Sequence, residues 1–195
     1  MPFHVPPVDD EREGLAGYLA QQQDAFRCVV FGLTDEQAGL APTAGTLTLG
    51  GLLKHVTWVQ GGWLEQVLCA PEPVPPRGEE TYRAHQEAWT WTAGDALPRA
   101  SEAYDAICAR VLDAVGTVDL DVAVPVPPAP WNPRDVDHWS VRWVWLHLIE
   151  ELARHAGHAD IVRESVDGAT TYELVAARDG LPETPWLKPW RPGDG

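Results

Sequence analysis

The stretch WSVRWVWLHLIEELARHAGHADIVRESVDGAT, residues 139–170, carries the clearest helical pattern in the chain. Its apolar side chains return every three or four positions, which is the spacing of one face of an α-helix. Val144, Leu148 and Leu152 lie on this face, and we expect Ile161, further along the segment, to border the core as well. We expect a long helix that begins near His138 or Ser140 and continues to about Val166. Asp167 and Gly168 should end it, because glycine is common just after the last turn of a helix.

Three more segments show the same periodicity. The first runs from about Asp9 to Gly32, the second starts near Thr48, and the third runs from about Leu97 to Val115. The apolar stripe of the second segment is Leu49, Leu52, Leu53, Val56, Val59 and Trp63. The apolar stripe of the third is Ala103, Ile107, Val111 and Val115. A shorter helix is expected at about Tyr82–Thr90.

Proline-rich connections separate these segments. Residues 71–80 and 116–137 are expected to be loops, since proline disrupts helix interiors. The second connection is also too irregular to predict a sheet. Four long helices joined by connections of unequal length indicate an all-α fold, an up-and-down four-helix bundle. The core of such a bundle is a usual place for metal ligands from facing helices.

Length and composition limit the classes of protein to consider. The 195 residues are enough for a single domain over 1–195, with a tail rich in proline and tryptophan from about residue 180. No apolar run reaches the ~20 residues that span a membrane, and the first residues lack the features of a secretory signal. We therefore expect a cytoplasmic protein with no membrane partner. The net charge of −15 argues against nucleic acid, whose phosphates need a concentrated basic patch.

Residues 147–158, HLIEELARHAGH, hold three histidines and two glutamates. Residues four apart share a helix face, so His147, Glu151 and His155 form one stripe that His158 continues. A glutamate and a histidine at this spacing can bind one divalent ion together. His55, on the apolar second segment, is the best candidate for a third ligand. The stripe can also be an exposed face, and His55 can be a hydrogen-bonded core residue.

Two segments carry a resemblance to a known family. LLKHVTW, residues 52–58, together with residues 139–170, resembles the DinB/YfiT-like superfamily of metal-binding four-helix bundles. The match is nearest to its branch of mycothiol-dependent S-transferases. Much of the superfamily binds metal through three histidines, and this branch has glutamate at the first of the two positions on the last helix. The resemblance therefore implies that His55, Glu151 and His155 are the metal ligands and, through the metal, the catalytic residues.

Other residues of the same segments are expected near the site. Two tryptophans and two histidines are interpreted as pocket residues or as supports of the ligands: Trp58, Trp143, His147 and His158. Aromatic walls of this kind suit an aromatic or amphiphilic substrate. Glu150 points about 100° away from the ligand glutamate and is interpreted as an acid at the edge of the core or as a support of the ligands.

Two histidines and one carboxylate leave open positions on a bound ion, as in catalytic zinc sites. Such ligands fit zinc, and nickel, manganese or iron can also occupy them. A thiol bound to the ion loses its proton readily. The expected reaction is therefore transfer of a low-molecular-weight thiol to an electrophilic small molecule, and the resemblance implies mycothiol as the thiol. The alternatives are a metal-dependent hydrolase and a non-enzymatic metal-binding or stress-response bundle that forms a homodimer.

The three cysteines are not needed for this chemistry. Cys28, Cys69 and Cys108 are widely spaced and form no CxxC motif. We interpret them as buried free thiols of a reducing compartment.

Overall fold

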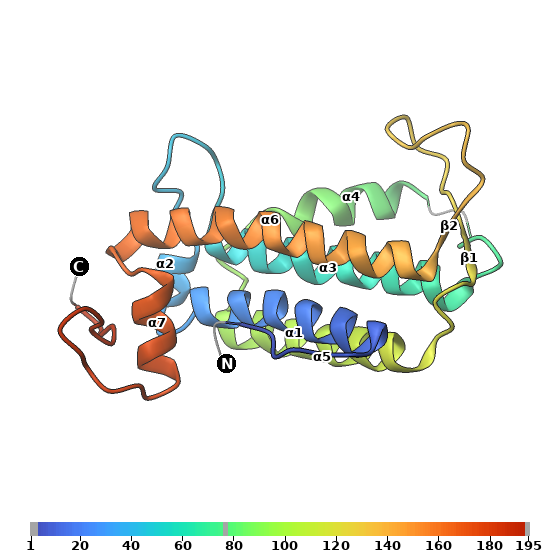
Figure 1. Cartoon of the computed structure of the whole chain (residues 1–195). Coiled ribbons are helices and arrows are strands. Elements are labelled where there is room, and N and C mark those ends of the chain that lie inside the picture. The colour runs from blue at the N-terminus through green and yellow to red at the C-terminus, as the bar shows by residue number, and fades with distance from the viewer. Residues whose placement is uncertain (1–3, 76–77, 194–195) are drawn as a thin grey trace.

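The computed structural model describes residues 4–75 and 78–193. Four long helices form its body, and Figure 1 shows them side by side. They are α1 (Glu11–Val29), α3 (Leu49–Cys69), α5 (Leu97–Thr117) and α6 (Val141–Asp167). The shorter elements are α2 (Asp35–Ala38), α4 (Glu79–Ala88), β1 (Ala123–Pro125), β2 (His138–Ser140) and α7 (Thr171–Arg178). The prediction of an all-α four-helix bundle is confirmed.

Helices α3 and α6 are antiparallel neighbours in this bundle. Each of α1 and α3 packs against both α5 and α6, so α1 and α3 occupy opposite corners. The colours of Figure 1 show α1 and α6 running in one direction and α3 and α5 in the other, while α4 carries the chain back. This arrangement places the first turns of α3 beside the middle of α6.

Polar caps set the ends of the helices. The Asp10 carboxylate accepts hydrogen bonds from two backbone amides in the first turn of α1, and the Ser140 hydroxyl accepts one from the Trp143 amide of α6. Such side chains satisfy amides that have no partner within the helix. At the other end of α6, Gly168 has φ 74°, a left-handed conformation that costs glycine little. The predicted end of this helix is therefore confirmed.

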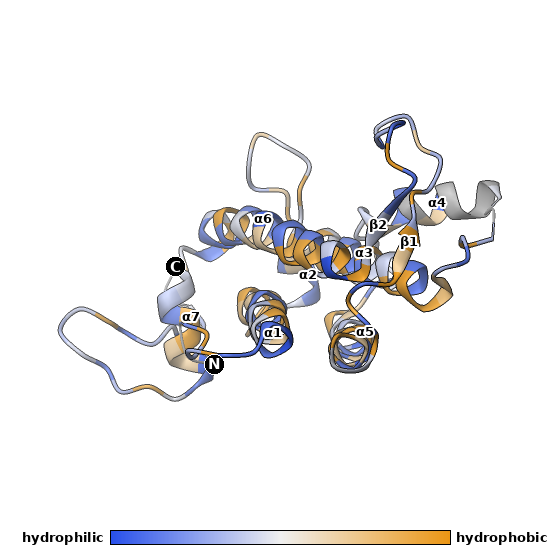
Figure 2. Ribbon diagram, turned by 45° about the vertical axis from the view of Figure 1, so that its right-hand side comes forward, coloured by the Kyte–Doolittle hydropathy of each residue, from blue (hydrophilic) through white to orange (hydrophobic). Residues whose placement is uncertain are grey.

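The apolar stripes meet inside the bundle. In Figure 2 the long helices are coloured both orange and blue, as expected for amphipathic helices. Two predicted core positions are wrong. Ile161 is 62% exposed because Ala159 and Val162 occupy the inward face at that level. In α5 the buried residue is Tyr104 rather than its neighbour Ala103, and the Tyr104 hydroxyl donates a hydrogen bond inside the core.

A small sheet lies in the connection between α5 and α6. Strands β1 and β2 pair antiparallel, with Val124 opposite Trp139, so the prediction that 116–137 contains no strand is wrong. Strands of three residues are too short for an alternating pattern to be recognised. Val124 is fully buried and β1 contacts α3. The sheet therefore fixes β2, and with it the start of α6, against the bundle.

The C-terminal tail returns to the bundle. Its Trp190 ring lies over Gly32 and 4.9 Å from the guanidinium carbon of Arg163, which is fully buried. That guanidinium also donates hydrogen bonds to the carbonyls of Val29 and Phe31. The tail thus docks beside the last turns of α1 and α6. Over residues 4–75 and 78–193, no helix combines the length and hydrophobicity needed to cross a bilayer.

Candidate metal site

The three predicted ligands meet between α3 and α6. His55 lies in the second turn of α3, and Glu151 and His155 lie one turn apart in α6. The Nε2 atoms of both histidines face the same carboxylate oxygen, Oε1 of Glu151, at 3.6 Å from His55 and 3.3 Å from His155. One donor atom from each residue lies within 4.8 Å of the other two. We call these three residues the triad.

The triad is shielded from solvent and charged. His55 is buried, and the side chains of His155 and Glu151 are 11% and 24% exposed. Hydrogen bonds with His155 and then His55 hold the pKa of Glu151 well below its usual range, although partial burial acts in the opposite direction. The carboxylate is therefore ionised at neutral pH, which is the state that metal ligation requires.

The spacing and chemistry of the triad fit a divalent ion. Two donors that each lie about 2.1 Å from a tetrahedral zinc ion are about 3.4 Å apart, close to the two N–O distances of the triad. Two imidazole nitrogens and one carboxylate oxygen are also ligands that zinc accepts. Three protein ligands leave room for a reactant on the ion. The triad can therefore hold a catalytic rather than a purely structural ion.

His158 contacts a member of the triad. Its Nδ1 atom lies 3.4 Å from Nδ1 of His155, so one of these two nitrogens donates to the other. The opposite nitrogen of His155 faces Glu151. Groups that bond the second nitrogen of a ligating imidazole fix its orientation and tautomer. The structure thus places His158 next to the His155 nitrogen that faces away from Glu151.

Four rings form a cluster one turn before Glu151 along α6. Trp139 of β2, Trp143 and His147 stack in order, with ring centroids 4.3 Å and 5.0 Å apart and planes within 10° of parallel. Trp63 of α3 meets all three rings at an angle. We call these four residues the aromatic cluster. It places Trp143, which is 37% exposed, and His147 on the same helix face as the triad.

The other predicted neighbours lie elsewhere. Trp58 is half-buried and packs against the apolar core. The Glu150 side chain is 72% exposed, and its carboxylate lies 3.6 Å from Nδ1 of His147. A position of Glu150 at the edge of the core is therefore wrong, because one 100° step from the inward-facing Glu151 turns its side chain to solvent. Its role as a support of the ligands stays a prediction.

Trp89, the residue after α4, also lies at the site, although no pattern in the sequence predicted it. Its ring is stacked on His55, with centroids 3.5 Å apart and planes 20° from parallel. The same ring meets His155 at an angle, 5.4 Å between centroids. No helical or strand periodicity could have identified this residue, because its position depends on the path of the connection between α4 and α5.

The cysteines are free thiols. Cys28 and Cys108 are buried as predicted, whereas Cys69 is partly exposed. Burial raises the pKa of Cys28 to about 11 and also raises the pKa of Cys108. Both thiols are therefore protonated at neutral pH and are poor nucleophiles.

Two hollows in the surface lie away from the triad. One, of about 520 Å³, is lined by the loop at 126–137. The other, of about 510 Å³, is lined by the C-terminal tail and the residues that follow α6. Neither is lined by a triad residue.

Comparisons with known proteins concern the family and the fold. The family model described as mycothiol-S-transferase matches residues 14–168, which include the whole of α3 and all three triad residues. No protein with a curated description matches the chain. A crystal structure of a conserved protein from Enterococcus faecalis is similar in fold, with a TM-score of 0.55 and 15% sequence identity. The similarity covers 83% of this chain and 100% of that one.

Proposed function

The chain belongs to the mycothiol-S-transferase family, one of the DinB/YfiT-like families, and on that premise we propose that it is a metal-dependent thiol transferase. It would add a low-molecular-weight thiol, mycothiol, to an electrophilic small molecule. The observation that carries the proposal is the convergence of His55, Glu151 and His155 within 4.8 Å of one another. They are the residues that hold the metal in this proposal.

Zinc is the ion that we propose, since two imidazoles and a carboxylate suit it; nickel, manganese and iron are the other candidates. A free thiol has a pKa near ~8.5 and is mostly protonated at neutral pH. A divalent ion, when bound, would lower the pKa of a coordinated thiol and so supply a thiolate nucleophile. The new bond joins the thiol sulfur to the electrophilic atom of the second substrate. If that atom belongs to a double bond or a strained ring, the broken bond leaves its electron pair on the neighbouring atom, which takes up a proton; if it carries a leaving group, that group departs with the bonding pair and the thiol proton is released.

The protein's own residues prepare this reaction. Glu151 contributes a negative charge that remains ionised because of its hydrogen bonds with His155 and His55. His158 holds the His155 ring from behind. The buried, protonated Cys28 and Cys108 do not compete as nucleophiles. In the proposed reaction the nucleophile is therefore a bound small-molecule thiol and not one of these two buried cysteines.

The aromatic cluster is the surface that we propose for the electrophile. Trp143 is partly exposed, and His147 links it to the turn that precedes Glu151. Aromatic faces bind flat apolar groups well and leave the reacting atom to be placed by the polar part of the site. Of the two other residues that we predicted for the pocket, His158 would support His155 rather than contact the electrophile, and Trp58 packs against the apolar core.

The test is a turnover assay with a panel of electrophiles, purified mycothiol and protein of known metal content. We expect product only when thiol and metal are both present. Product formed with metal but without any thiol would favour the hydrolase alternative. Stoichiometric metal without turnover of any electrophile, with any cellular thiol, would instead favour a non-enzymatic metal-binding bundle, and size measurements would then test the predicted homodimer.

A further inference from the structure

The connection between α4 and α5 crosses the first turns of α3 at very short range. This close approach is possible because residues 50 and 51, both buried in α3, are glycines. A Cβ at Gly51 would lie 2.5 Å from the Trp89 carbonyl oxygen, and a Cβ at Gly50 would collide with the Trp91 ring. The two glycines therefore form a seat on which residues 89–91 lie against the helix that carries His55.

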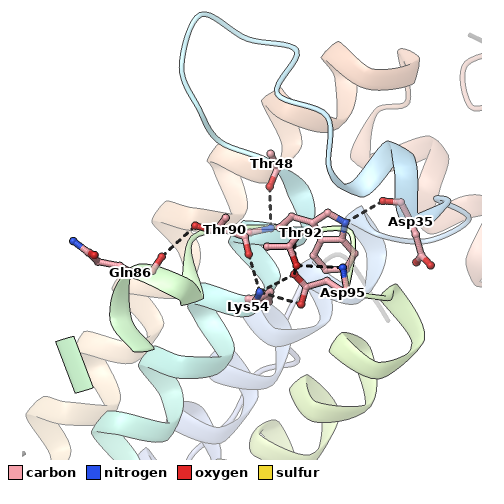
Figure 3. Close-up of polar contacts among 10 residues, drawn as sticks. Asp35, Thr48, Lys54, Gln86, Thr90, Thr92 and Asp95 are labelled. Atoms are coloured by element: carbon pink, nitrogen blue, oxygen red, sulfur yellow. Dashed lines mark hydrogen bonds and ion pairs between the residues drawn. The ribbon is translucent and has the colours of Figure 1, made fainter. Parts of the chain in front are cut away.

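Lys54 fixes the connection from the side. Its ammonium group donates to the Thr90 carbonyl at 2.7 Å and to both carboxylate oxygens of Asp95 at 3.0 and 2.9 Å. Asp95 also accepts hydrogen bonds from the amide and the hydroxyl of Thr92. Figure 3 shows dashed lines from the ammonium group of Lys54 to Thr90 above it and to Asp95 on its right. The connection is thus closed into a loop anchored on the residue that precedes His55.

A second anchor ties the same connection to α2. The Trp91 indole N–H donates to the Asp35 carbonyl oxygen at 3.1 Å, and the Leu97 amide donates to the Asp35 carboxylate at 2.7 Å. Both ends of the segment 89–97 are therefore held, one at the glycine seat and Lys54, the other at Asp35. Such a segment has little freedom to move its first residue, Trp89.

These anchors place one ring against two triad histidines. Trp89 covers a face of His55 with ring centroids 3.5 Å apart, and its edge meets His155. The ring torsion of histidine is intrinsically broad, so an imidazole needs neighbours to fix its plane. Ligating imidazoles usually obtain this from a hydrogen bond. Here a stacked indole also restricts the plane of His55.

We propose that Trp89 is a positioning residue, held by the Gly50–Gly51 seat and the Lys54–Asp95 ion pair, that presets His55 and His155 for metal binding. The inference rests on the proposed metal site. A flat aromatic ring at position 89 can stack on the His55 imidazole, whereas an aliphatic side chain of similar hydrophobicity cannot. It also means that one face of His55 is closed, so reactants reach the ion from the side away from Trp89.

The experiment compares three single variants. Trp89→Phe keeps a flat ring, Trp89→Leu keeps only apolar bulk, and Trp131→Leu is a matched control because Trp131 is 84% exposed and far from α3 in sequence. Zinc affinity is measured by competition with a chromophoric chelator, and the melting temperature is measured on chelated protein. We expect zinc affinity to fall ~10–100-fold in Trp89→Leu, to stay within about threefold in Trp89→Phe, and to be unchanged in Trp131→Leu.

A fourth variant leaves Trp89 in place. Lys54→Met keeps the stem of the side chain and removes its ammonium bonds to Thr90 and Asp95, so we expect it to weaken zinc binding in the same direction as Trp89→Leu. Lys54→Met also tests the proposal if Trp89→Leu does not fold. Equal zinc affinity in wild type, Trp89→Leu and Lys54→Met would overturn the proposal, as would equal losses in Trp89→Leu and Trp89→Phe at equal melting temperatures.

A metal-free measurement separates this proposal from the proposed function. In chelated protein, the ring current of Trp89 should shift the His55 ring protons upfield in NMR spectra, and Trp89→Leu should abolish that shift. If wild type binds no zinc but the shift is present and lost in Trp89→Leu, the metal site fails and the positioning of His55 by Trp89 stands. If wild type binds zinc and shows no such shift, the positioning proposal fails alone.

Discussion

Glu151 and His155 lie one turn apart on α6, and the carboxylate oxygen of the first is 3.3 Å from Nε2 of the second. One helix therefore supplies two of the three donors without help from the tertiary fold. The third donor, His55, reaches the same oxygen from α3. Metal binding by this site should consequently couple the packing of α3 against α6 to the presence of the ion.

Metal removal should lower thermal stability. An ion that binds only the folded chain stabilises it by about 2.7 kcal/mol when its free concentration is 100 times the Kd. Differential scanning fluorimetry of zinc-loaded and chelated protein should show a shift of several degrees. His155→Ala serves as the control, because its melting temperature should not respond to zinc. An unchanged melting temperature after chelation of wild type would contradict the assignment.

Two variants, Glu151→Gln and Glu151→His, should show whether the charge or the shape of the Glu151 side chain matters for metal binding. Glutamine keeps the size of the side chain but removes the charge, so metal content should fall while the chelated protein keeps its fold. Histidine at this position recreates three imidazole ligands, and that variant should retain metal with altered thiol transfer. The measurement is elemental analysis beside mycothiol-dependent turnover. Full metal and full activity in both Glu151→Gln and His155→Ala would show that the ligands are misassigned.

His158→Ala and His147→Ala should differ from each other. His158 supports His155, so its loss should weaken zinc affinity by ~10–100-fold. His147 belongs to the aromatic cluster, so its loss should leave zinc affinity nearly unchanged and raise the KM for the electrophile. Chelator competition and steady-state kinetics on both variants provide the measurements. A loss of zinc affinity in His147→Ala but not in His158→Ala would contradict the roles that we assign to these two residues.

The Lys54–Asp95 ion pair should make stability depend on pH. Partial burial acts to raise the pKa of Asp95, but hydrogen bonds from Lys54 and Thr92 lower it overall. A lowered pKa stabilises the fold above the unfolded value of about 3.9, and this contribution is lost as pH falls through the folded value. We expect Asp95→Asn to cost about 1 kcal/mol at pH 7, since both side chains are partly exposed.

Urea denaturation at pH 7, 5 and 3 measures this effect. The free energy of unfolding of Asp95→Asn should be lower than that of wild type by the same amount at pH 7 and pH 5. This difference should become smaller toward pH 3. Asp121→Asn is a suitable control, because Asp121 forms an ion pair at the surface with Arg142 and is 78% exposed. If the loss in unfolding free energy of Asp95→Asn is the same down to pH 3, the charge of the Asp95 carboxylate does not contribute to stability.

The three cysteines should react at different rates with an alkylating reagent. Cys28 and Cys108 are buried and have raised pKa values, whereas Cys69 is partly exposed. Mass spectrometry after brief treatment with iodoacetamide at pH 8 should find the label mainly on Cys69. Cys69→Ser should still transfer thiol at the rate of wild type. Rapid labelling of Cys108 in folded protein would show that the bundle core opens readily.

The long helices were predictable because each buries one face, and burial leaves a repeat of three or four residues in the sequence. The pair Glu151 and His155 was predictable for the same reason, since their spacing alone places them together. His55 required the additional resemblance, because a single histidine on an apolar helix has more than one explanation.

The remaining features depend on contacts between distant segments. Trp89 reaches His55 only because α4 and two glycines of α3 bring the connection there. Strands β1 and β2 have three residues each, and α7 has eight. All three elements are too short for their hydrophobic periodicity to be recognised in the sequence. Ile161 and Ala103 show that an apolar residue inside a helical segment need not face the core: Ile161 lies nine residues after Leu152 and so points about half a turn away from its direction, and Tyr104 occupies the core beside Ala103.

The division of the triad between α3 and α6 has a consequence for the order in which the protein is made. His55 and Glu151 are 96 residues apart (151 − 55), and at 5–20 residues per second a ribosome needs roughly 5–20 s to add that length. During this interval His55 has left or is leaving the ribosome without its partners. An ion held by all three residues can join the chain only after α6 has emerged and folded. Metal uptake would then report that the last long helix has taken its place.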